Sequence, residues 1–444
     1  MLRADRSRET RASVRYAAGF SFLVAWLVPR LADAGGPLGP QGSDIKTSAY
    51  SLDLFQGPVL ASARVVGMAG AYDALAEGAE GIPFNPAAAS QRYPYSSSKF
   101  DYELTASITF PSSVAGTDFE NNGKTFGHHQ SSVWGTVGVM MQNEHLGFGT
   151  IISLQNYAIV GPSASPVKDL TVRVFKVDSV FSYGFFRDQL HVGGGLRGAI
   201  FNAVDTSASV GRLLLGTYGV GAQSGVLWRP RTLPLRLGGT VRSPVLKSFE
   251  AGPSSEGGES GDRVIGGFYL PTGVDLPWEA ECGVAIQFGE RPLNLGWTDE
   301  TTLGLPVKDA HRVVRARYRA IPREKLLLTF GTLITGPTKG AVGVSSMLAQ
   351  QVDRSGERSS VTLRGGGEAE VLRDRLQLRA GSYMEPTRFR QSSPRLHGTI
   401  GFEVRVLDWS AFGIFPEDNR FRISGAIDGA RGYFGWSLAV GSWY

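Results

Sequence analysis

The side chains best suited to catalysis or metal binding in this sequence are six histidines and a single cysteine. The histidines show no H-E-x-x-H spacing, and no G-x-S-x-G sequence provides a nucleophile elbow. The adjacent pair His128-His129 lies among Asn and Gly residues, where we expect an outer loop rather than a metal site. Cys282 stands alone, which excludes a disulfide framework and cysteine-based zinc or iron–sulfur centres. The sequence therefore predicts no catalytic residue, no metal and no cofactor, and we do not expect an enzyme.

A glycine-rich hexapeptide, GGGLRG at 193–198, matches the G-x-G-x-x-G pattern of phosphate-binding loops. That pattern holds a phosphate when a strand precedes it and a helix begins at its end. Here the next residues, from Ala199 to Asn202, continue as a strand. We interpret these glycines as sites of a bulge or of barrel curvature.

Three arginines at a spacing of two, Arg315, Arg317 and Arg319, form the most regular basic feature of the chain. They alternate with apolar residues over 314–320, which predicts a strand with one basic face. Facing a wet lumen, this basic ladder could guide a carboxylate through charge-assisted hydrogen bonds. We favour the simpler interpretation, in which the arginines balance acidic residues of the same lumen. The acids expected there are Glu279, Glu281, Glu368 and Glu370.

Long amphipathic strands are the elements that must position these side chains. Every second residue from Phe100 to Phe110 is apolar, and the residues between them are polar. The same period recurs at 279–288, 314–320, 376–381, 399–406 and 421–428. Alternation alone fits a soluble sheet with its apolar face inward or an outer-membrane barrel with that face toward lipid. Soluble strands run about 5–6 residues and tilted membrane strands about 9–11, so these runs favour the membrane barrel.

Turn and loop lengths point the same way, because membrane barrels alternate short periplasmic turns with longer outer loops. Short turns are expected at 142–144, 187–188, 229–233, 289–292, 322–324 and 373–374. Longer loops are expected at 111–130, 158–168, 248–275, 302–309, 336–359 and 385–394, and the segment 252–261 is flexible by composition. About 16 candidate strands lie between Lys99 and Tyr444, and boundary errors of about two to four residues allow 14.

Composition and the N-terminal leader agree with export. Glycine accounts for 58 of 444 residues, about twice its usual share, which disfavours an all-helical protein. Residues 1–34 combine a basic start, a short apolar core and an A-D-A cleavage pattern, and they predict a secretory signal peptide. The alternative is an amphipathic transit helix or an anchor. After the leader, no apolar stretch reaches about 18 residues, so we expect no transmembrane helix.

Removal of the leader also changes the charge of the chain. It takes away six arginines and three acids, which leaves 39 basic residues against 37 acidic ones. This near balance has no basic footprint, so we expect no nucleic-acid partner.

The last strand of the chain is amphipathic and ends in aromatic residues. Its apolar face consists of Phe434, Trp436, Leu438, Val440 and Tyr444. Such a strand is similar to the recognition signal of bacterial outer-membrane barrels, which would make the barrel-assembly machinery a partner during insertion. The alternative is an ordinary closing strand.

Residues 62–90 differ from the rest, because they combine small residues with a predicted short helix from Arg64 to Glu77 that ends before Pro83 and Pro86. Their sequence resembles the N-terminal motif of the FadL/TodX/PorV outer-membrane superfamily, with Ala69 at a position where glycine is common and with Glu77 and Glu80 in place of an acidic pair. The matching positions are Ala63, Arg64, Gly67, Met68, Gly70, Ala71, Tyr72, Ala74, Ala76, Asn85, Pro86 and Ala87. A weaker match covers 378–386.

The resemblance implies an all-β fold: a transmembrane antiparallel barrel of 14 strands, with 16 still allowed, and an N-terminal helical hatch inside or beneath it. The expected division is a signal peptide at 1–34, a periplasmic or hatch segment at 35–98 and the barrel at 99–444. Arg64, Gly67, Met68, Gly70, Asn85 and Pro86 are then the candidate hatch and gating residues.

The expected function is passive passage of hydrophobic small molecules, such as long-chain fatty acids, across the bacterial outer membrane. The partners would be outer-membrane lipid, lipopolysaccharide and an apolar ligand. Two alternatives remain: a PorV-like scaffold or shuttle for a secreted-protein client, and a structural barrel with no transport role.

Overall fold

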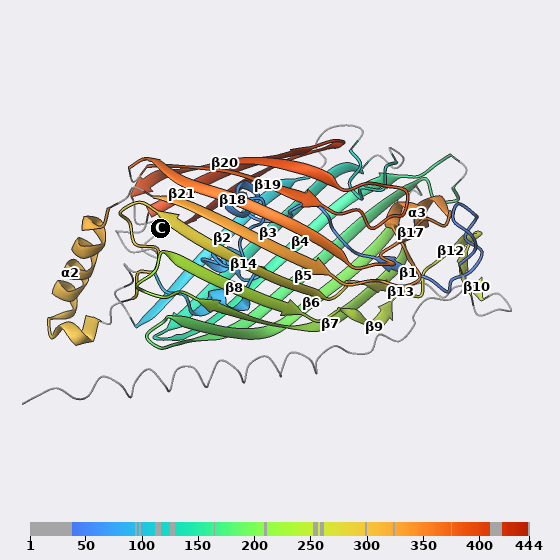
Figure 1. The fold of residues 1–444 in the computed structure, drawn as a ribbon. Helices are drawn as coiled ribbons and strands as arrows, with labels where there is room; N and C mark the ends of the chain where they lie inside the picture. The colour runs from blue at the N-terminus through green and yellow to red at the C-terminus, as the bar shows by residue number, and fades with distance from the viewer. Residues whose placement is uncertain are drawn as a thin grey trace, which may run out of the picture. The chain divides into compact units, whose positions relative to one another are not determined.

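The computed structural model describes residues 38–93, 96, 99–111, 117–124, 129–163, 165–207, 211–251, 256–257, 262–297, 300–322, 325–373, 375–408 and 420–442. Within these residues, fourteen antiparallel strands close into a barrel, as predicted (Figure 1). Closure is complete because β2 pairs with both β3 and β22, while β6 pairs with both β5 and β7. The predicted signal peptide, His128 and Tyr444 lie outside the described residues.

The barrel strands are 8 to 17 residues long, which suits a tilted crossing of a membrane. They are β2 (Phe100–Phe110), β3 (His129–Asn143), β4 (Leu146–Val160), β5 (Asp169–Phe185), β6 (Leu190–Asp205), β7 (Arg212–Trp228), β8 (Leu235–Arg242), β14 (Glu279–Phe288), β15 (Leu326–Thr335), β18 (Ser360–Leu372), β19 (Leu376–Glu385), β20 (Arg395–Asp408), β21 (Arg420–Ala430) and β22 (Tyr433–Ser442).

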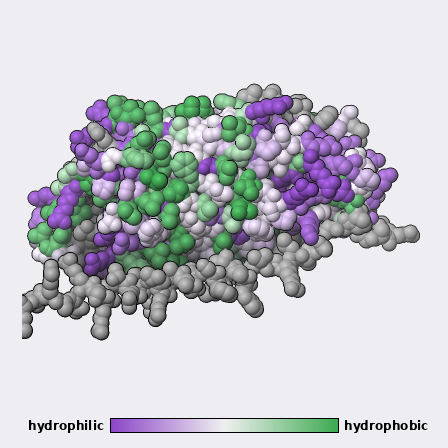
Figure 2. Space-filling model, in the orientation of Figure 1, coloured by the Kyte–Doolittle hydropathy of each residue, from purple (hydrophilic) through white to green (hydrophobic). Residues whose placement is uncertain are grey.

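The burial of side chains shows which face of the sheet meets lipid. Along β2 the apolar residues Phe100, Leu104 and Ile108 are exposed, whereas the polar residues Glu103 and Thr105 are buried. A soluble sheet would show the opposite arrangement, so the apolar face points outward and the polar face lines the lumen. The visible face of the barrel accordingly carries apolar side chains around its middle and hydrophilic ones toward its ends (Figure 2).

Two further strands, β20 and β22, confirm the predicted inward and outward faces elsewhere in the barrel. On β20, Phe402 and Val404 are 44% and 37% exposed, although both are apolar. On the last strand, Phe434, Leu438 and Val440 point outward and Trp436 is half-buried, while Ser437 and Ala439 are buried.

The two ends of the barrel differ in the length of their connections. Short turns link β3 to β4, β5 to β6 and β18 to β19 at the end where β22 finishes. The opposite end carries longer, folded loops with β10 (Glu256–Gly257), β11 (Arg263–Ile265), β12 (Phe268–Tyr269), β13 (Gly273–Asp275), β16 (Ala341–Val342), α3 (Val344–Ala349) and β17 (Arg354–Ser355). By the usual asymmetry of such barrels, we call the first the periplasmic end and the second the outer end.

The N-terminal segment runs through the lumen between these ends. At the outer end, β1 (Ser51–Asp53) pairs with β13 and β16 of the loops. Residues 62–90, which we call the hatch, follow and include α1 (Ala63–Gly67), η3 (Ala79–Gly81) and η4 (Pro86–Ser90). Helix α1 lies against β19–β22 and η4 against β3–β7, so the hatch touches different arcs of the wall. The hatch therefore occupies the lumen.

The hatch helix is shorter than predicted. We expected it to extend from Arg64 to Glu77, but α1 ends at Gly67. The chain turns there because Ala69 and Gly70 adopt positive φ angles of 54° and 71°, which a right-handed helix excludes.

The prediction of a strand at 314–320 was wrong. These residues belong to helix α2 (Val307–Ala320), which projects beyond the periplasmic end of the barrel (Figure 1). Ala310 and Val314, four residues apart, are the buried face of this helix. The sequence alternates with a period of two over 314–320, but the apolar positions 310, 314 and 318 also satisfy the helical period.

This helix also changes the predicted connections. The expected turns at 289–292 and 322–324 are the two ends of a single connection between β14 and β15, which also holds η5 (Glu300–Leu303). The loop expected at 302–309 lies inside that connection, at the periplasmic rather than the outer end. None of the described helices is long and apolar enough to cross a membrane.

Candidate functional site: the hatch and the cavities beside it

Glycines of the barrel wall allow the hatch backbone to approach closely. Gly193 of β6 and Gly225 of β7 are partners in the ladder, and both face Asn85-Pro86 of the hatch. A Cβ atom at Gly193 would lie 2.5 Å from the Pro86 carbonyl carbon, and one at Gly225 would overlap the Asn85 side chain. The first glycine of the G-x-G-x-x-G sequence thus makes room for the hatch, and the whole sequence continues as strand, as predicted.

Asn85 fixes this contact by hydrogen bonds on both sides. Its Nδ2 donates to the carbonyl oxygens of Val226 (3.0 Å) and Asp73 (3.2 Å), and its Oδ1 accepts from the Ala87 backbone N–H (3.0 Å). Pro86 then starts η4 in the position where its missing N–H is not needed. The predicted pair Asn85-Pro86 is therefore an anchor between the hatch and the wall.

A glycine of the hatch also meets a glycine of the wall on the other side of the lumen, at β20. A Cβ atom at Gly67 would lie 3.2 Å from the Cα of Gly401 in β20, and the Gly67 carbonyl accepts a hydrogen bond of 3.1 Å from Thr399. Met68 is fully buried, and its carbonyl oxygen faces Gly366 of β18. Gly70 accepts a hydrogen bond of 3.2 Å from Arg364 through its carbonyl oxygen.

Arg64 joins the hatch to a buried network of charges. Its guanidinium nitrogens lie 2.9 Å from Glu77 Oε2 and 3.1 Å from Glu368 Oε2, and Nη1 donates to the Tyr72 hydroxyl. Glu368 also pairs with Arg379 at 2.7 Å and with Lys325. Removal of one member would leave a buried charge with fewer opposite charges around it, which is costly, so the network resists separation of the hatch from the wall.

Other ion pairs extend this network around the lumen. Glu80 of the hatch lies 3.1 Å from Arg422, which also pairs with Glu403 at 2.8 Å. Glu77 lies 2.8 Å from Arg236. Burial by itself would raise the pKa of Glu77, but Arg236 and then Arg64 outweigh burial and lower it from 4.5 to about 2. The Glu77 carboxylate is thus held ionised by Arg236 of the wall and Arg64 of the hatch.

The predicted acids face the lumen, whereas the predicted basic ladder does not. Glu281 lies 3.0 Å from Arg364 and 3.2 Å from Arg242, Glu279 pairs with Arg197, and Glu368 is in the network above. Arg315, Arg317 and Arg319 all fall on α2, outside the barrel, and Arg317 is exposed. The alternation of the sequence did place Arg379 and Arg422 on polar strand faces, but nothing in it paired them with the hatch.

Cavities lie beside the hatch. A cavity of about 170 Å³ lies between the hatch and the preceding residues 54–60 and has both apolar and charged walls, including Leu54, Val59, Leu276 and Arg242. A small apolar cavity of about 20 Å³ lies in the wall near Phe201 and Tyr218, and it shares Leu54 and Leu276 with the larger one. At the outer end, a mainly apolar cavity of about 230 Å³ is bounded by Ile159, Leu348 and neighbouring residues.

A discontinuity of the sheet coincides with the small cavity. β8 pairs with β14, but the next strand along the chain, β9 (Leu246–Ala251), pairs with β7 and not with β14. Between them the wall is joined by the isolated bridge of Val245 and Leu276, with N···O distances of 2.9 and 3.3 Å.

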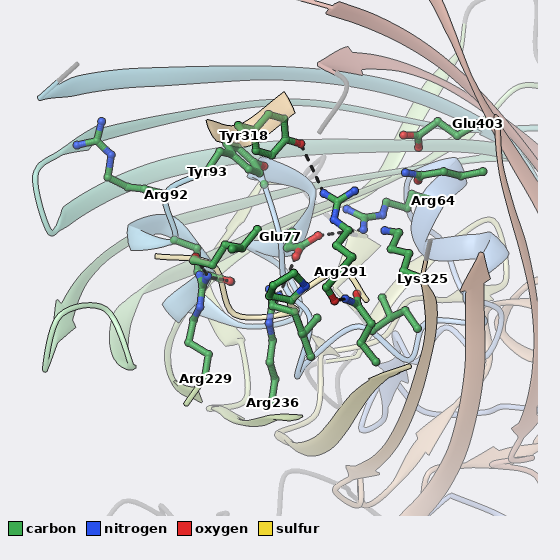
Figure 3. Close-up of a pocket in the computed structure, with 18 residues that line it drawn as sticks. Arg64, Glu77, Arg92, Tyr93, Arg229, Arg236, Arg291, Tyr318, Lys325 and Glu403 are labelled. Carbon is green, nitrogen blue, oxygen red and sulfur yellow. Dashed lines mark hydrogen bonds and ion pairs between the residues drawn. The ribbon is translucent and has the colours of Figure 1, made fainter. Parts of the chain in front are cut away.

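Another cavity, of about 70 Å³, lies on the periplasmic side of the hatch (Figure 3). Its walls come from the hatch, from the turn after β7 and from the connection that carries α2. The residues that give it its charge are Arg64, Glu77, Arg92, Arg229, Arg236, Arg291, Lys325 and Glu403. Apart from Arg64 and Glu77, none of these was singled out as a site residue or a lumen charge from the sequence.

Solved structures share this architecture. A FadL homologue from Pseudomonas aeruginosa superimposes with a TM-score of 0.53 at 12% identity, covering 87% of this chain and 99% of that chain. The chain has a FadL-like outer-membrane barrel fold. A second structure, the CymD monoaromatic hydrocarbon channel, gives a TM-score of 0.50 at 11% identity, covering 87% of this chain and 97% of that one. No family model and no curated protein sequence matches the chain.

The FadL-like fold agrees with the resemblance found in residues 62–90. Together with the outward apolar face, it supports the predicted location in a bacterial outer membrane. At 11–12% identity, the feature shared with these structures is the fold.

Proposed function

We propose that this protein is an outer-membrane channel through which hydrophobic small molecules, such as fatty acids or other apolar compounds, cross by passive diffusion under control of the hatch. CymD, a monoaromatic hydrocarbon channel with a similar fold, supports this class of solute. The hatch fills the middle of the lumen, so a wide aqueous pore of the porin type is not the favoured interpretation.

The cavities shared by the lumen and the wall are the observation that carries this proposal. Leu54 and Leu276 bound both the lumen cavity of about 170 Å³ and the wall cavity of about 20 Å³. An apolar solute gains free energy by leaving water for the apolar part of these walls, at roughly 25 cal/mol per Å². Opening of the wall at the break between β9 and β14 would give it a sideways exit toward lipid, and a shift of the hatch would give it an inward exit.

The gating residues would act through their contacts with the wall. Gly67, Met68 and Gly70 lie against β18–β20, and Asn85-Pro86 lies against β6 and β7. The Arg64 network holds the hatch between these two contacts. Passage would require one of the contacts to loosen while the other holds. Outer-membrane lipid and lipopolysaccharide would surround the apolar face, and the barrel-assembly machinery would recognise the final strand.

Uptake of labelled dodecane and of a labelled long-chain fatty acid by cells with and without the gene tests this proposal. Cells that carry the gene should take up at least one of the two solutes several times faster. The substitution Leu276→Arg should remove most of this increase, because it places a charge between the two cavities where an apolar solute must pass.

Leu305→Arg is the matched control, because Leu305 is 45% exposed and bounds none of the cavities described above. Insertion of each variant is checked by its heat-modifiable mobility on gels. Equal uptake with and without the gene, with redundant transporters excluded, would reject transport of these solutes. The scaffold and structural alternatives both predict that result, and loss of a surface-attached client on gene deletion would distinguish the scaffold.

A further inference from the structure

The cavity on the periplasmic side of the hatch is unusually cationic. Six basic side chains line it, against the two carboxylates of Glu77 and Glu403. The basic residues are Arg64, Arg92, Arg229, Arg236, Arg291 and Lys325. Figure 3 shows Arg64, Arg291 and Lys325 close together beside the cavity, whereas Arg92 points away from them.

Most of these cations already have a carboxylate partner. Arg64 and Arg236 share Glu77, and Lys325 pairs with Glu368. Arg291 lies 3.6 Å from Glu370, too far for a hydrogen bond, and its Nη2 donates weakly to Tyr318 of α2 at 3.5 Å. The Nη1 atom of Arg291 is buried without a hydrogen-bond partner among the described residues.

Arg229 is the exception, because its guanidinium touches no carboxylate in the described part of the chain. Its residue is only 6% exposed, and its side chain donates to Gln91 Oε1 at 3.2 Å and to the Leu295 carbonyl at 2.8 Å. A guanidinium has five N–H donors, so donors remain for a further acceptor. Burial of a cation that touches no carboxylate is costly, and an anion in the cavity would offset part of that cost.

The charges near Arg229 add to the excess of positive charge in the cavity. Burial, and next the positive charge of Arg236, lowers the pKa of Arg229 to about 9, although Glu77 and Asp188 act in the opposite direction. The protein therefore holds positive charge here against its own repulsion, and an anion would relieve that repulsion.

The size and lining of the cavity limit what can bind. A volume of about 70 Å³ holds about five water-sized groups at about 10–15 Å³ each. Part of the wall is apolar, from Leu293, Leu295 and Leu327. We propose that this cavity is an anion site for a short-chain monocarboxylate, whose carboxylate binds Arg229 and Arg291 while its few carbons contact these leucines. The site lies on the periplasmic side of the hatch, and its binding can be measured without transport.

Binding of propionate to the purified full chain in detergent, measured by calorimetry, tests the site. Wild type should bind propionate, and Arg229→Gln should weaken that binding at least tenfold. Arg291→Gln should weaken it as well, which keeps the test valid if the first variant fails to insert. Arg231→Gln should bind like wild type, because Arg231 lies in the same turn but is exposed and does not line the cavity.

Two further ligands test which chemical feature of propionate the site recognises. Propionamide has nearly the same shape without the charge and should not bind, whereas equal binding of both would overturn the anion site. Inorganic phosphate tests for a general anion site. Binding of phosphate but not propionate, no binding of either, or propionate binding that both arginine variants retain would overturn the proposal. Uptake of apolar solutes is measured separately, so failure here leaves the proposed transport standing.

Discussion

Two segments of the chain lie outside the barrel strands and contain helices: the hatch, which precedes β2, and the connection with α2, which joins β14 to β15. Both contain short helices and arginines, yet their surroundings are opposite. Arg64 of the hatch is buried, with carboxylates at 2.9 and 3.1 Å. On α2, the Arg312 side chain is 81% exposed, and its described partner is Asp309 at 3.4 Å on the same helix.

This difference shows that the same residue type has different consequences in the two places. In the lumen, carboxylates and carbonyls take the place of water around the arginines. Loss of an arginine that pairs with a carboxylate therefore leaves that carboxylate buried without its partner. On α2, water solvates the arginine with or without a partner. The hatch should therefore tolerate few substitutions, and the exposed face of α2 should tolerate many.

The largest effect is expected for Glu77→Gln, which removes the carboxylate shared by Arg64 and Arg236. The folded pKa of Glu77, about 2, is below its ordinary value of 4.5, so ionised Glu77 stabilises the protein above pH 4.5. The expected loss at neutral pH is about 2–3 kcal/mol, reduced from the full shift because the side chain is 22% exposed. Urea unfolding in lipid vesicles measures it.

The pH dependence provides the control for this variant. The difference between wild type and Glu77→Gln should shrink as the pH falls from 4.5 toward 2, where the wild-type carboxyl takes up its proton. A difference that stays constant over this range would show that the effect is one of shape rather than charge.

An intermediate effect is expected for Gly193→Val, which fills the space that the hatch uses at Pro86. Overpacking of this kind costs about 1–3 kcal/mol and should displace Asn85-Pro86 from the wall. Unfolding gives the loss of stability, and conductance in planar bilayers reports loosening of the hatch. Gly194→Val is the control, because a Cβ there meets its nearest atom at 3.5 Å, an ordinary contact. Equal behaviour of the two variants would contradict close docking of the hatch.

The smallest effect is expected for Arg312→Gln on α2. An exposed ion pair between positions three apart contributes about 0.5 kcal/mol or less. Unfolding free energies of this variant and wild type should agree within that amount. A loss of several kcal/mol would mean that the Arg312 side chain is packed against another part of the protein, and the contrast with the hatch would fail.

Much of the wall could be predicted from the sequence, because alternation is local. The outward positions of Phe402 and Phe434 and the inward positions of Glu103 and Glu281 depend only on the period of two within each strand. The same local rule failed at 314–320, where Arg315, Arg317 and Arg319 satisfy a strand by alternation. The apolar positions 310, 314 and 318 satisfy a helix, and burial of Ala310 and Val314 decided between the two.

The sequence by itself determined that this chain has an apolar and a polar side, because a strand of alternating residues has two faces wherever it lies. Only the tertiary structure decided which charges meet. Arg64 and Glu368 are 304 residues apart in the chain and are brought within 3.1 Å when the sheet closes around the hatch. Such pairs depend on the register and curvature of the whole barrel, and no short stretch of sequence contains that information.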